Sequence, residues 1–399
     1  MSESNKLPLS RRSIGDLQRK LLIIMIGLGC LAPAVLPDWG RRAVAADDPS
    51  GQSDQIEQKL NELRKSVKAA ASAERTRGLI SEAFSLIDEA LAADEYAAAI
   101  RVSALAVETA VILDNQHVSA VCARRKDEVS NIAKEAKKLT QQMSKLAKSP
   151  KDSTANFEVG RFRCSVRGDW DGGLPLLARG SNSSWAAVAK RDLAQPTNAD
   201  ERLGLGNNWS VLASNEKGAR KLALAQRAVH WYRQVLREGS GDSRKKAAAA
   251  MESLPICYLT DMDEIEVTRS YGTMGKYGNY GGEVGKPIEV NGFKYPNSLG
   301  LHPLSSDEAT VRYKLNSPYK TFVAGVGIND SQQEFKDTVI FLVIGDGEVL
   351  WKSPPVKSRH VVIPCEVNVK GVKTLELKCR CPDSFYSAHA VWLDPHLLK

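Results

Sequence analysis

The chain has 399 residues, of which 43% are hydrophobic and 26% charged, and its formal net charge is +8. This composition is typical of a soluble globular protein that buries a core, and the length allows two or three domains. Residues 1–45 hold seven of the 55 basic and three of the 47 acidic residues, so the rest of the chain has a net charge of +4. So small an excess argues against a nucleic-acid-binding protein.

The N-terminus has the pattern of an export signal. Basic residues precede the apolar run 21–36, which Pro33 interrupts, and Ala43 and Ala45 follow in A-x-A spacing. These features predict a cleaved secretory signal peptide over residues 1–45. We therefore expect an exported protein that is periplasmic, at the cell surface or secreted. The alternative is an uncleaved anchor, for which the apolar run is short.

Residues 46–254 show a helical pattern that begins after the polar stretch 47–55. They are rich in Ala, Leu, Glu and Lys, and apolar residues recur at helical spacing, as between residues 79 and 91. A longer and more polar helix is expected over residues 119–143. Its lysines are typical of a solvated helix face.

Beyond residue 150 the pattern predicts short helices joined in pairs. We expect these helices over residues 157–167, 173–179, 186–193, 203–213 and 222–237. Residues 228–236 resemble tetratricopeptide-like helical hairpins. Because no strict repeat period is visible, we predict an irregular helical array. Such an array serves as a scaffold or as a surface for a protein partner.

Four tryptophans lie in this helical region. They are Trp170, Trp185, Trp209 and Trp231. Aromatic faces stack on sugars and peptides and also fill helical cores, so both interpretations apply to them. Their helical spacing favours packing in the core.

Six cysteines follow residue 45. They are Cys122, Cys164, Cys257, Cys365, Cys379 and Cys381. Cys379 and Cys381 alternate with leucines on one face of an expected strand, which favours small buried hydrophobic side chains. A cross-strand disulfide to Cys365 is the alternative that export permits. No C-x-x-C motif occurs, so nothing supports a zinc site.

From about residue 260 the sequence changes from a helical to an alternating period. Residues 311–315 and 322–328 alternate, and Asn291-Gly292 and Asp346-Gly347 are strong signals for hairpin turns. Further short strands are expected over residues 361–363, 372–378 and 389–393. About eight short strands at this spacing predict a closed β-sandwich or jelly roll over residues 255–399.

Five ordered motifs in this region resemble one family. They are Asn291–Tyr295 with Ser298–His302, Phe322–Asp330, Val339–Ser353, Val369–Leu377 and Ala388–Asp394. Together they resemble the NPCBM domain, a family of carbohydrate-binding modules. The resemblance implies a galactose-binding-like β-sandwich and recognition of a glycan that contains galactose. Pro303-Leu304 departs from the family pattern after the histidine, which implies a differently shaped loop.

A sugar site on a β-sandwich needs an aromatic stacking face and fixed hydrogen-bonding groups, and edge loops supply both. The candidate ligand-binding residues are Tyr277, Tyr280, His302, Asn329, Asp330, Tyr386, His389 and Trp392. Structural alternatives compete with this role. His302 and His389 are also explained as a buried hydrogen-bonded pair, and Trp392 as a core residue of the last strand.

The sequence predicts a multidomain α and β protein, with an α-helical hairpin array before a galactose-binding-like β-sandwich. No G-x-S-x-G, H-E-x-x-H or P-loop motif occurs, so we predict a non-catalytic protein that binds glycan without a cofactor. Aspartates near Asp330 and Asp346 allow a structural calcium ion without predicting one. Two alternatives are a protein-interaction adaptor with a structural sandwich, and an accessory subunit of a glycan-degrading system.

Overall fold

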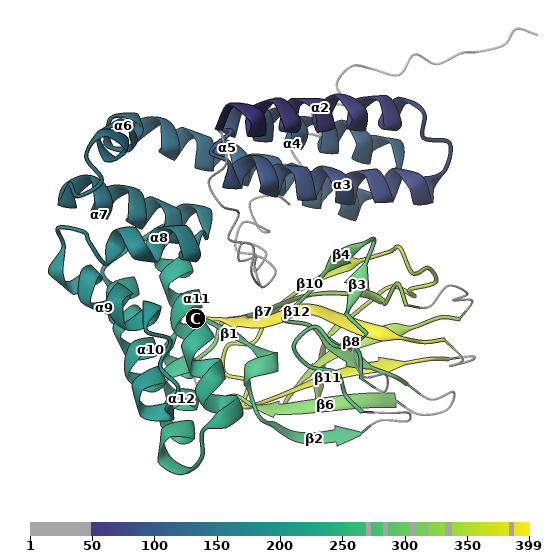
Figure 1. Cartoon of the computed structure of the whole chain (residues 1–399). Helices are drawn as coiled ribbons and strands as arrows, with labels where there is room; N and C mark the ends of the chain where they lie inside the picture. Colours follow the sequence, from purple (N-terminus) through teal and green to yellow (C-terminus); the bar gives the residue numbers. More distant parts are fainter. Residues whose placement is uncertain are drawn as a thin grey trace, which may run out of the picture. The chain divides into compact units, whose positions relative to one another are not determined.

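The computed structural model describes residues 49–399, except residues 269–272, 282–285, 304–307, 317, 332–336 and 383–386. The predicted signal peptide lies outside the described residues and stays a prediction. Helices occupy the described chain as far as residue 253, and antiparallel sheets follow (Figure 1). This order confirms the predicted fold class.

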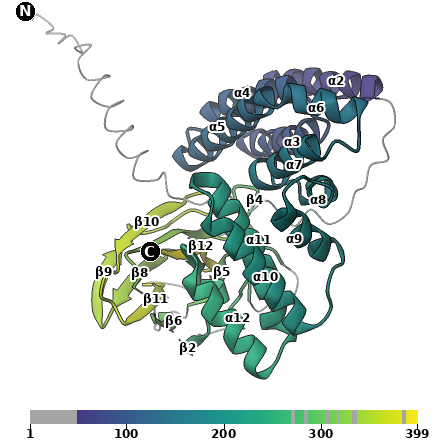
Figure 2. The same ribbon diagram turned by 90° about the vertical axis from the view of Figure 1, so that its left-hand side faces the viewer.

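The helical region is a series of helices that pack against their neighbours in the chain (Figure 2), as α3 does with α4 and α10 with α11. The helices are α2 (Pro49–Lys68), α3 (Ala73–Ala92), α4 (Tyr96–Ile112), α5 (Gln116–Lys138), α6 (Thr140–Lys148), α7 (Ser153–Phe162), the π-helix η2 (Arg163–Arg167), α8 (Trp170–Leu177), α9 (Ser183–Leu193), α10 (Ala199–Ser214), α11 (Gly218–Glu238) and α12 (Gly241–Ser253). This packing is consistent with tetratricopeptide-like hairpins.

Short polar side chains begin several of these helices. Ser72, Asn115, Asp152, Asp169, Asn182 and Asn198 each accept a hydrogen bond from the backbone N–H three residues further on. Each bond satisfies an N–H group that the first helical turn leaves without a partner. The cap at Asn182 explains why α9 begins at Ser183 and not at residue 186, where the sequence pattern placed its start.

Two helix predictions are corrected by the structure. Residues 119–143 do not form one helix, because the backbone leaves helical geometry at Leu139 (φ −100°, ψ 9°), between α5 and α6. The hydroxyl of Thr140 donates to the carbonyl of Lys137 and satisfies an acceptor at the end of α5. The polar stretch 47–55 is helical from Pro49 onward, because proline at a helix start has no N–H to leave unsatisfied.

The tryptophans of the helical region lie in its core, as predicted. Trp170, Trp185, Trp209 and Trp231 all pack in one cluster. The indole N–H groups of Trp209 and Trp231 donate to Oδ2 of Asp192 at 2.6 and 2.9 Å, and Arg227 pairs with the same carboxylate. Asp192 is 0% exposed. A buried carboxylate is stable only where donors surround it, and these three side chains supply them.

The β-sandwich consists of two antiparallel sheets, in the orders β1-β12-β7-β10, with β5 also paired to β12, and β2-β6-β11-β8-β9. The strands are β1 (Ile256–Tyr258), β2 (Glu264–Thr268), β3 (Glu289–Val290), β4 (Phe293–Lys294), β5 (Leu299–Leu301), β6 (Glu308–Lys314), β7 (Thr321–Ile328), β8 (Ile340–Gly345), β9 (Glu348–Lys352), β10 (Ile363–Asn368), β11 (Thr374–Arg380) and β12 (Ala390–Leu398). Their inward side chains form one core, to which β6 contributes Tyr313 and β7 Phe322. The predicted alternation along both strands is confirmed.

Both predicted hairpin turns are confirmed. Asn291-Gly292 joins β3 to β4, and Asp346-Gly347 joins β8 to β9. These turn residues have φ values of 57°, 77°, 50° and 92° in chain order. Asn, Asp and Gly reach this left-handed region at the least energetic cost, which is why these dipeptides mark hairpins in the sequence.

One strand prediction is shifted by the structure. Residues 361–363 were expected as a strand, and β10 instead begins at Ile363 and continues through Pro364 to Asn368. Proline lacks the N–H that a central strand needs, but β10 is the outermost strand of its sheet. An edge position tolerates proline, so the strand passes through it.

The cysteines after residue 45 are buried. Cys122, Cys164, Cys257, Cys365 and Cys379 carry free thiols, and Cys381 is buried as well. The alternative of a disulfide to Cys365 is therefore wrong, and Cys379 packs in the sandwich core as a small hydrophobic residue. Burial raises the pKa of the Cys122 and Cys257 thiols to about 12.

The helices and the sandwich belong to one compact unit and share a buried ion pair. Arg233 of α11 donates to the two carboxylate oxygens of Asp261 at 2.6 and 2.8 Å, and to Oδ1 of Asn297 at 2.9 Å. The Asp261 side chain is 1% exposed. The positive charge that balances the buried carboxylate of Asp261 therefore comes from an arginine of the helical region.

A second contact joins α3 and α5 to the β3–β4 hairpin. The rings of Phe84 and Phe293 have centroids 5.2 Å apart, and Nε2 of His117 lies 2.9 Å from the hydroxyl of Tyr295. Burial, reinforced by the positive charge of Arg124, lowers the pKa of His117 to about 4 from an ordinary 6.5. His117 is therefore neutral in the folded protein near neutral pH.

This lowered pKa predicts that acidification destabilises the fold. Below about pH 6.5 the unfolded chain binds a proton at His117 that the folded chain binds only near pH 4, so stability falls as the pH falls through this window. We expect H117Q, which cannot titrate, to lose less of its Tm between about pH 7 and pH 4.5 than the unmodified protein. An equal loss of Tm in the two proteins would contradict this role of His117.

Among the helices of residues 49–399 that the structure describes, none combines the length and the apolar character that a bilayer span requires.

Candidate functional site

Two histidines meet at one end of the strands β5 and β12. His302 follows β5 and His389 precedes β12, and these antiparallel strands pair with Leu301 opposite Ala390. The pairing places the two imidazoles edge to face, with ring centroids 5.6 Å apart. Both side chains are half-buried. Strand register therefore brings together two residues that are far apart in the sequence.

Neighbouring side chains fix the orientation of His389. The ring of Tyr280 stacks on it with centroids 4.5 Å apart and planes 18° apart, and Nδ1 lies 3.0 Å from Oγ of Ser331. Tyr280 donates to the carbonyl of Leu301 at 3.3 Å, and Asn329 donates to Ser331 at 2.9 Å. We call His302, His389, Tyr280 and Ser331 the histidine corner.

His302 is the second half-buried imidazole of the histidine corner. Burial lowers its pKa, while a hydrogen bond to the carbonyl of Pro303, 3.0 Å from Nδ1, acts in the opposite direction. A bond to a carbonyl requires the proton on Nδ1 and makes Nε2 the acceptor nitrogen. A neutral imidazole has one donor and one acceptor, and the donor of His302 is engaged by Pro303.

Asn329 and Asp330 attach the β3–β4 hairpin to the end of β7. Oδ1 of Asn329 accepts from the N–H of Glu289 at 2.8 Å, and Oδ2 of Asp330 accepts from the N–H of Gly292 at 2.7 Å. Asn329 is 0% exposed, so its amide acts within the fold. Asp330 is half-buried, and burial raises its pKa against the effect of the backbone N–H groups of Gly292 and Asn291.

Three candidate residues stand apart from this cluster. Trp392 is 0% exposed and packs edge-on against Phe341 at 5.4 Å, so it cannot stack on a sugar, and its structural alternative holds. Tyr277 is 37% exposed and lies beside α11, with the guanidinium of Arg233 5.6 Å from its ring centroid. Tyr386 lies outside the described residues.

Sequence reasoning missed Ser331. Its hydroxyl lies between the amide of Asn329 and the imidazole of His389 and joins the two motifs that contain them. A serine directly after the Asn329-Asp330 pair was the available signal, because a short hydroxyl at the end of a strand is placed to bond neighbouring loops. Tyr280 was predicted as a ligand contact. Its side chain is only 4% exposed, and its ring stacks on the imidazole of His389, so its role in the structure is to hold that imidazole in place.

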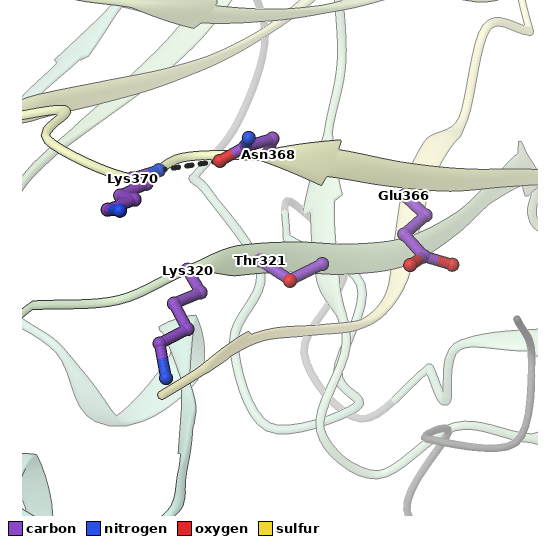
Figure 3. Close-up of a pocket in the computed structure, with 5 residues that line it drawn as sticks. All are labelled: Lys320, Thr321, Glu366, Asn368 and Lys370. Carbon is purple, nitrogen blue, oxygen red and sulfur yellow. Dashed lines mark hydrogen bonds between the residues drawn. The ribbon is translucent and has the colours of Figure 1, made fainter.

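A shallow depression between the ends of β7 and β10 is a second candidate site. It encloses about 480 Å³ and is lined by Lys320, Thr321, Glu366, Asn368 and Lys370. Figure 3 shows these side chains, with the backbone N–H of Lys370 donating to Oδ1 of Asn368 at 3.0 Å. The lining residues are all polar or charged, so the depression offers hydrogen bonds without a stacking face.

No group of three or more His, Cys, Asp or Glu side chains that could hold a metal ion occurs within the described part of the chain. The two aspartates considered for calcium are engaged by backbone groups. Oδ2 of Asp330 accepts from Gly292, and Oδ1 of Asp346 accepts from the N–H of Thr374 at 2.8 Å. Both carboxylates therefore stabilise turns.

Comparison with known proteins finds a family model that matches the C-terminal region. Residues 256–398 match the family model described as the NPCBM/NEW2 domain. A Renibacterium salmoninarum protein named as an endo-alpha-N-acetylgalactosaminidase is 27% identical over 235 residues, which cover 52% of this chain and 15% of that protein.

Solved structures of CBM51 modules are also similar to this chain. The CBM51 module of Clostridium perfringens GH95, in complex with methyl-galactose, is 22% identical and has a TM-score of 0.30, covering 36% of this chain and 99% of that one. The tandem CBM51 modules of the family 98 glycoside hydrolase from Streptococcus pneumoniae are 18% identical with a TM-score of 0.33, covering 36% of this chain and 47% of that one.

Proposed function

Because residues 256–398 form a domain of the NPCBM type, we propose that this chain is an exported, non-catalytic protein that binds carbohydrate through that domain. The match over nearly the whole C-terminal region is the observation that carries the proposal. The signal-peptide pattern of residues 1–45 supports export. In this proposal the helical region is a scaffold, to which Arg233 and Asp261 fasten the module.

We propose the histidine corner as the point of contact with the sugar. His302 and His389 keep part of their surface exposed, while Tyr280 beneath them is buried and holds one ring in place. Imidazoles fixed in this way bind hydroxyl groups without first losing rotational freedom. The site is open and its ligand polar, so we expect modest affinity.

Galactose and N-acetylgalactosamine are the first sugars to test. The family resemblance of the five motifs implies galactose, and the name of the Renibacterium salmoninarum relative contains N-acetylgalactosamine. The chain covers 15% of that relative, so this choice of sugar belongs to the proposal. Isothermal titration of the chain from residue 46 against a glycan panel tests it. Saturable heat with at least one of the two sugars is expected, and silence across the panel with folded protein would refute sugar binding.

The non-catalytic role has its own test. It is supported by the lack of known catalytic motifs in the sequence. After prolonged incubation with glycans that end in α-linked N-acetylgalactosamine, we expect no release of reducing sugar. Turnover that scales with protein concentration would instead support the second function, a glycosidase like the one named for the relative.

Removing either imidazole is expected to weaken binding. H302A and H389A should each raise the Kd by about five- to tenfold, because each loses hydrogen bonds worth about 1–1.5 kcal/mol. The more conservative variants H302N and H389Q control for folding. The Tm of each of the four variants is compared with that of the unmodified protein, to show that all four are folded. The variant E366Q alters the depression of Figure 3 and is expected to bind normally. Loss of binding in E366Q with normal binding in the histidine variants would move the site to the depression.

A further inference from the structure

The helix α4 has apolar residues on its outer side as well as on its inner side. Its inner side packs against α2, α3 and α5 (Figure 2). Its outer side, which we call the α4 face, carries Ala97, Ile100, Ala104, Val111 and Ile112. Ala104 is half-buried and the other four are exposed, Val111 to 70% and Ile112 to 61%. A helix that is apolar all round is normally covered on every side, so the α4 face is expected to have a partner.

The residues of the α4 face follow the spacing of a contact between two helices. Ala97, Ile100, Ala104, Val107 and Val111 succeed one another at intervals of three and four residues. These are the a and d positions of a heptad, which line the seam between paired helices. Val107 is half-buried at the edge of this stripe and also contacts the helical core. The fully buried residues of α4 occupy the other heptad positions, so the stripe is separate from the side that packs inward.

The stripe is symmetric about Ala104. Ala97 lies seven residues before it and Val111 seven residues after it. In an antiparallel pair of α4 helices with a two-fold axis at Ala104, Ala97 of each copy therefore meets Val111 of the other. Ala104 meets its own copy, and its small side chain allows the two helices to approach closely.

The charged residues of α4 favour this antiparallel pairing. Arg101 and Glu108 are the two charged residues of α4, and both are exposed at the heptad position e, on one edge of the stripe. An antiparallel pair places e opposite e, so Arg101 of each copy faces Glu108 of the other. A parallel pair places e opposite g, and the g positions Ser103 and Ala110 are uncharged.

The ion pairs within one chain leave Glu108 available for this contact. Arg101 pairs with Glu57 of α2, and both side chains are more than 40% exposed. Within the part of the chain that the structure describes, Glu108 takes part in no ion pair. An exposed ion pair contributes little to stability, so Arg101 can also attract the carboxylate of a second copy.

We propose that α4 forms the interface of a two-fold symmetric dimer, whose partner is a second copy of this chain. The helix has 17 residues and is about 25 Å long, so one pair of helices buries less than the roughly 1,600 Å² of a standard stable interface. The dimer is therefore expected to dissociate on dilution, with a Kd in the micromolar range. It carries two sandwich modules and binds a repeated ligand with avidity. The interface itself does not depend on sugar recognition.

Sedimentation velocity of the chain from residue 46 to residue 399 tests the proposal. Between about 1 and about 100 µM we expect the mass to rise from that of one chain to that of two. The variant A104E brings two carboxylates together at the two-fold axis and is expected to raise the Kd of dimerisation at least about a hundredfold. A187E makes the same change at an exposed alanine of α9 and should dimerise like the unmodified protein.

Charge reversal tests the orientation of the two helices. E108R places two arginines opposite each other at both ends of the contact and is expected to raise the Kd about tenfold. The double variant R101E/E108R restores opposite charges and should return the Kd to within about threefold of the original. E348R reverses an exposed glutamate of the sandwich and should leave the Kd unchanged.

A cysteine at the two-fold axis tests the contact directly. Under oxidation A104C is expected to form a disulfide-linked dimer, because position 104 faces its own copy, whereas A187C should remain a single chain. The native thiols are buried and do not compete. A single chain at every concentration would overturn the proposal, and so would equal dimerisation of A104E and A187E. Failure of R101E/E108R to recover the dimer that E108R loses would reject the antiparallel arrangement. The Tm of each variant shows that it is folded.

Discussion

Replacing Arg233 with alanine is expected to lower the free energy of unfolding by about 3–5 kcal/mol. The substitution leaves the Asp261 carboxylate, 1% exposed, without the two hydrogen bonds at 2.6 and 2.8 Å that now balance its charge. A buried unpaired carboxylate costs far more than an exposed ion pair contributes. Urea denaturation followed by far-UV circular dichroism measures the change.

Two further variants make this prediction specific. Arg237 is an exposed arginine on the same helix, so R237A should change stability by less than about 0.5 kcal/mol. The double variant R233A/D261A should lose less stability than the sum of its two single variants, because neither charge then remains buried alone. Strict additivity would show that Arg233 and Asp261 are not coupled. If they are coupled, the fragment 255–399 should be less stable than the same module within the whole chain.

Replacing Asp192 with alanine is expected to cost a similar amount, about 3–5 kcal/mol. The carboxylate is 0% exposed and accepts from the indoles of Trp209 and Trp231 while it pairs with Arg227. Its removal leaves two buried indole donors and a guanidinium without their acceptor. The loss should appear both in the urea midpoint and in the fluorescence of the two tryptophans.

Two further substitutions test whether the buried carboxylate of Asp192 is the cause of this loss of stability. D192N keeps one acceptor oxygen and loses the charge, so its stability should fall between those of the unmodified protein and D192A. D127A removes an exposed carboxylate from α5 and should be neutral within about 0.5 kcal/mol. If D192A were as stable as D127A, the buried network would not contribute to the helical core.

Local signals in the sequence were enough to predict much of the fold. The turns at Asn291-Gly292 and Asp346-Gly347 were predictable because both residues of each turn have positive φ. Few residue types adopt positive φ at low energetic cost, so the dipeptide itself indicates the turn. The strands β1 and β5 were missed because each has three residues, buried throughout, too few to show a period of two. The break at Leu139 depends on backbone geometry that no glycine or proline marks.

The candidate site was harder to predict because its contacts are spatial. His302 and His389 belong to different motifs, and only the register of β5 against β12 places their rings 5.6 Å apart. Burial likewise depends on tertiary packing, which is why the complete burial of Asn329 could not be predicted, whereas the alternation of the last strand already offered a core position for Trp392. The ion pair of Arg233 and Asp261 has no sequence pattern at all, since either residue alone is ordinary on a surface.

The buried thiols have a consequence for how this protein tolerates oxidants. Only the thiolate attacks a disulfide or a peroxide, and at a pKa of about 12 roughly one thiol in 10⁵ is ionised at pH 7. Cys122 and Cys257 are also shielded from reagents by their burial. In the folded chain these two thiols should therefore stay unreacted in a reducing and in an oxidising compartment. They can form wrong disulfides only in the interval before folding is complete.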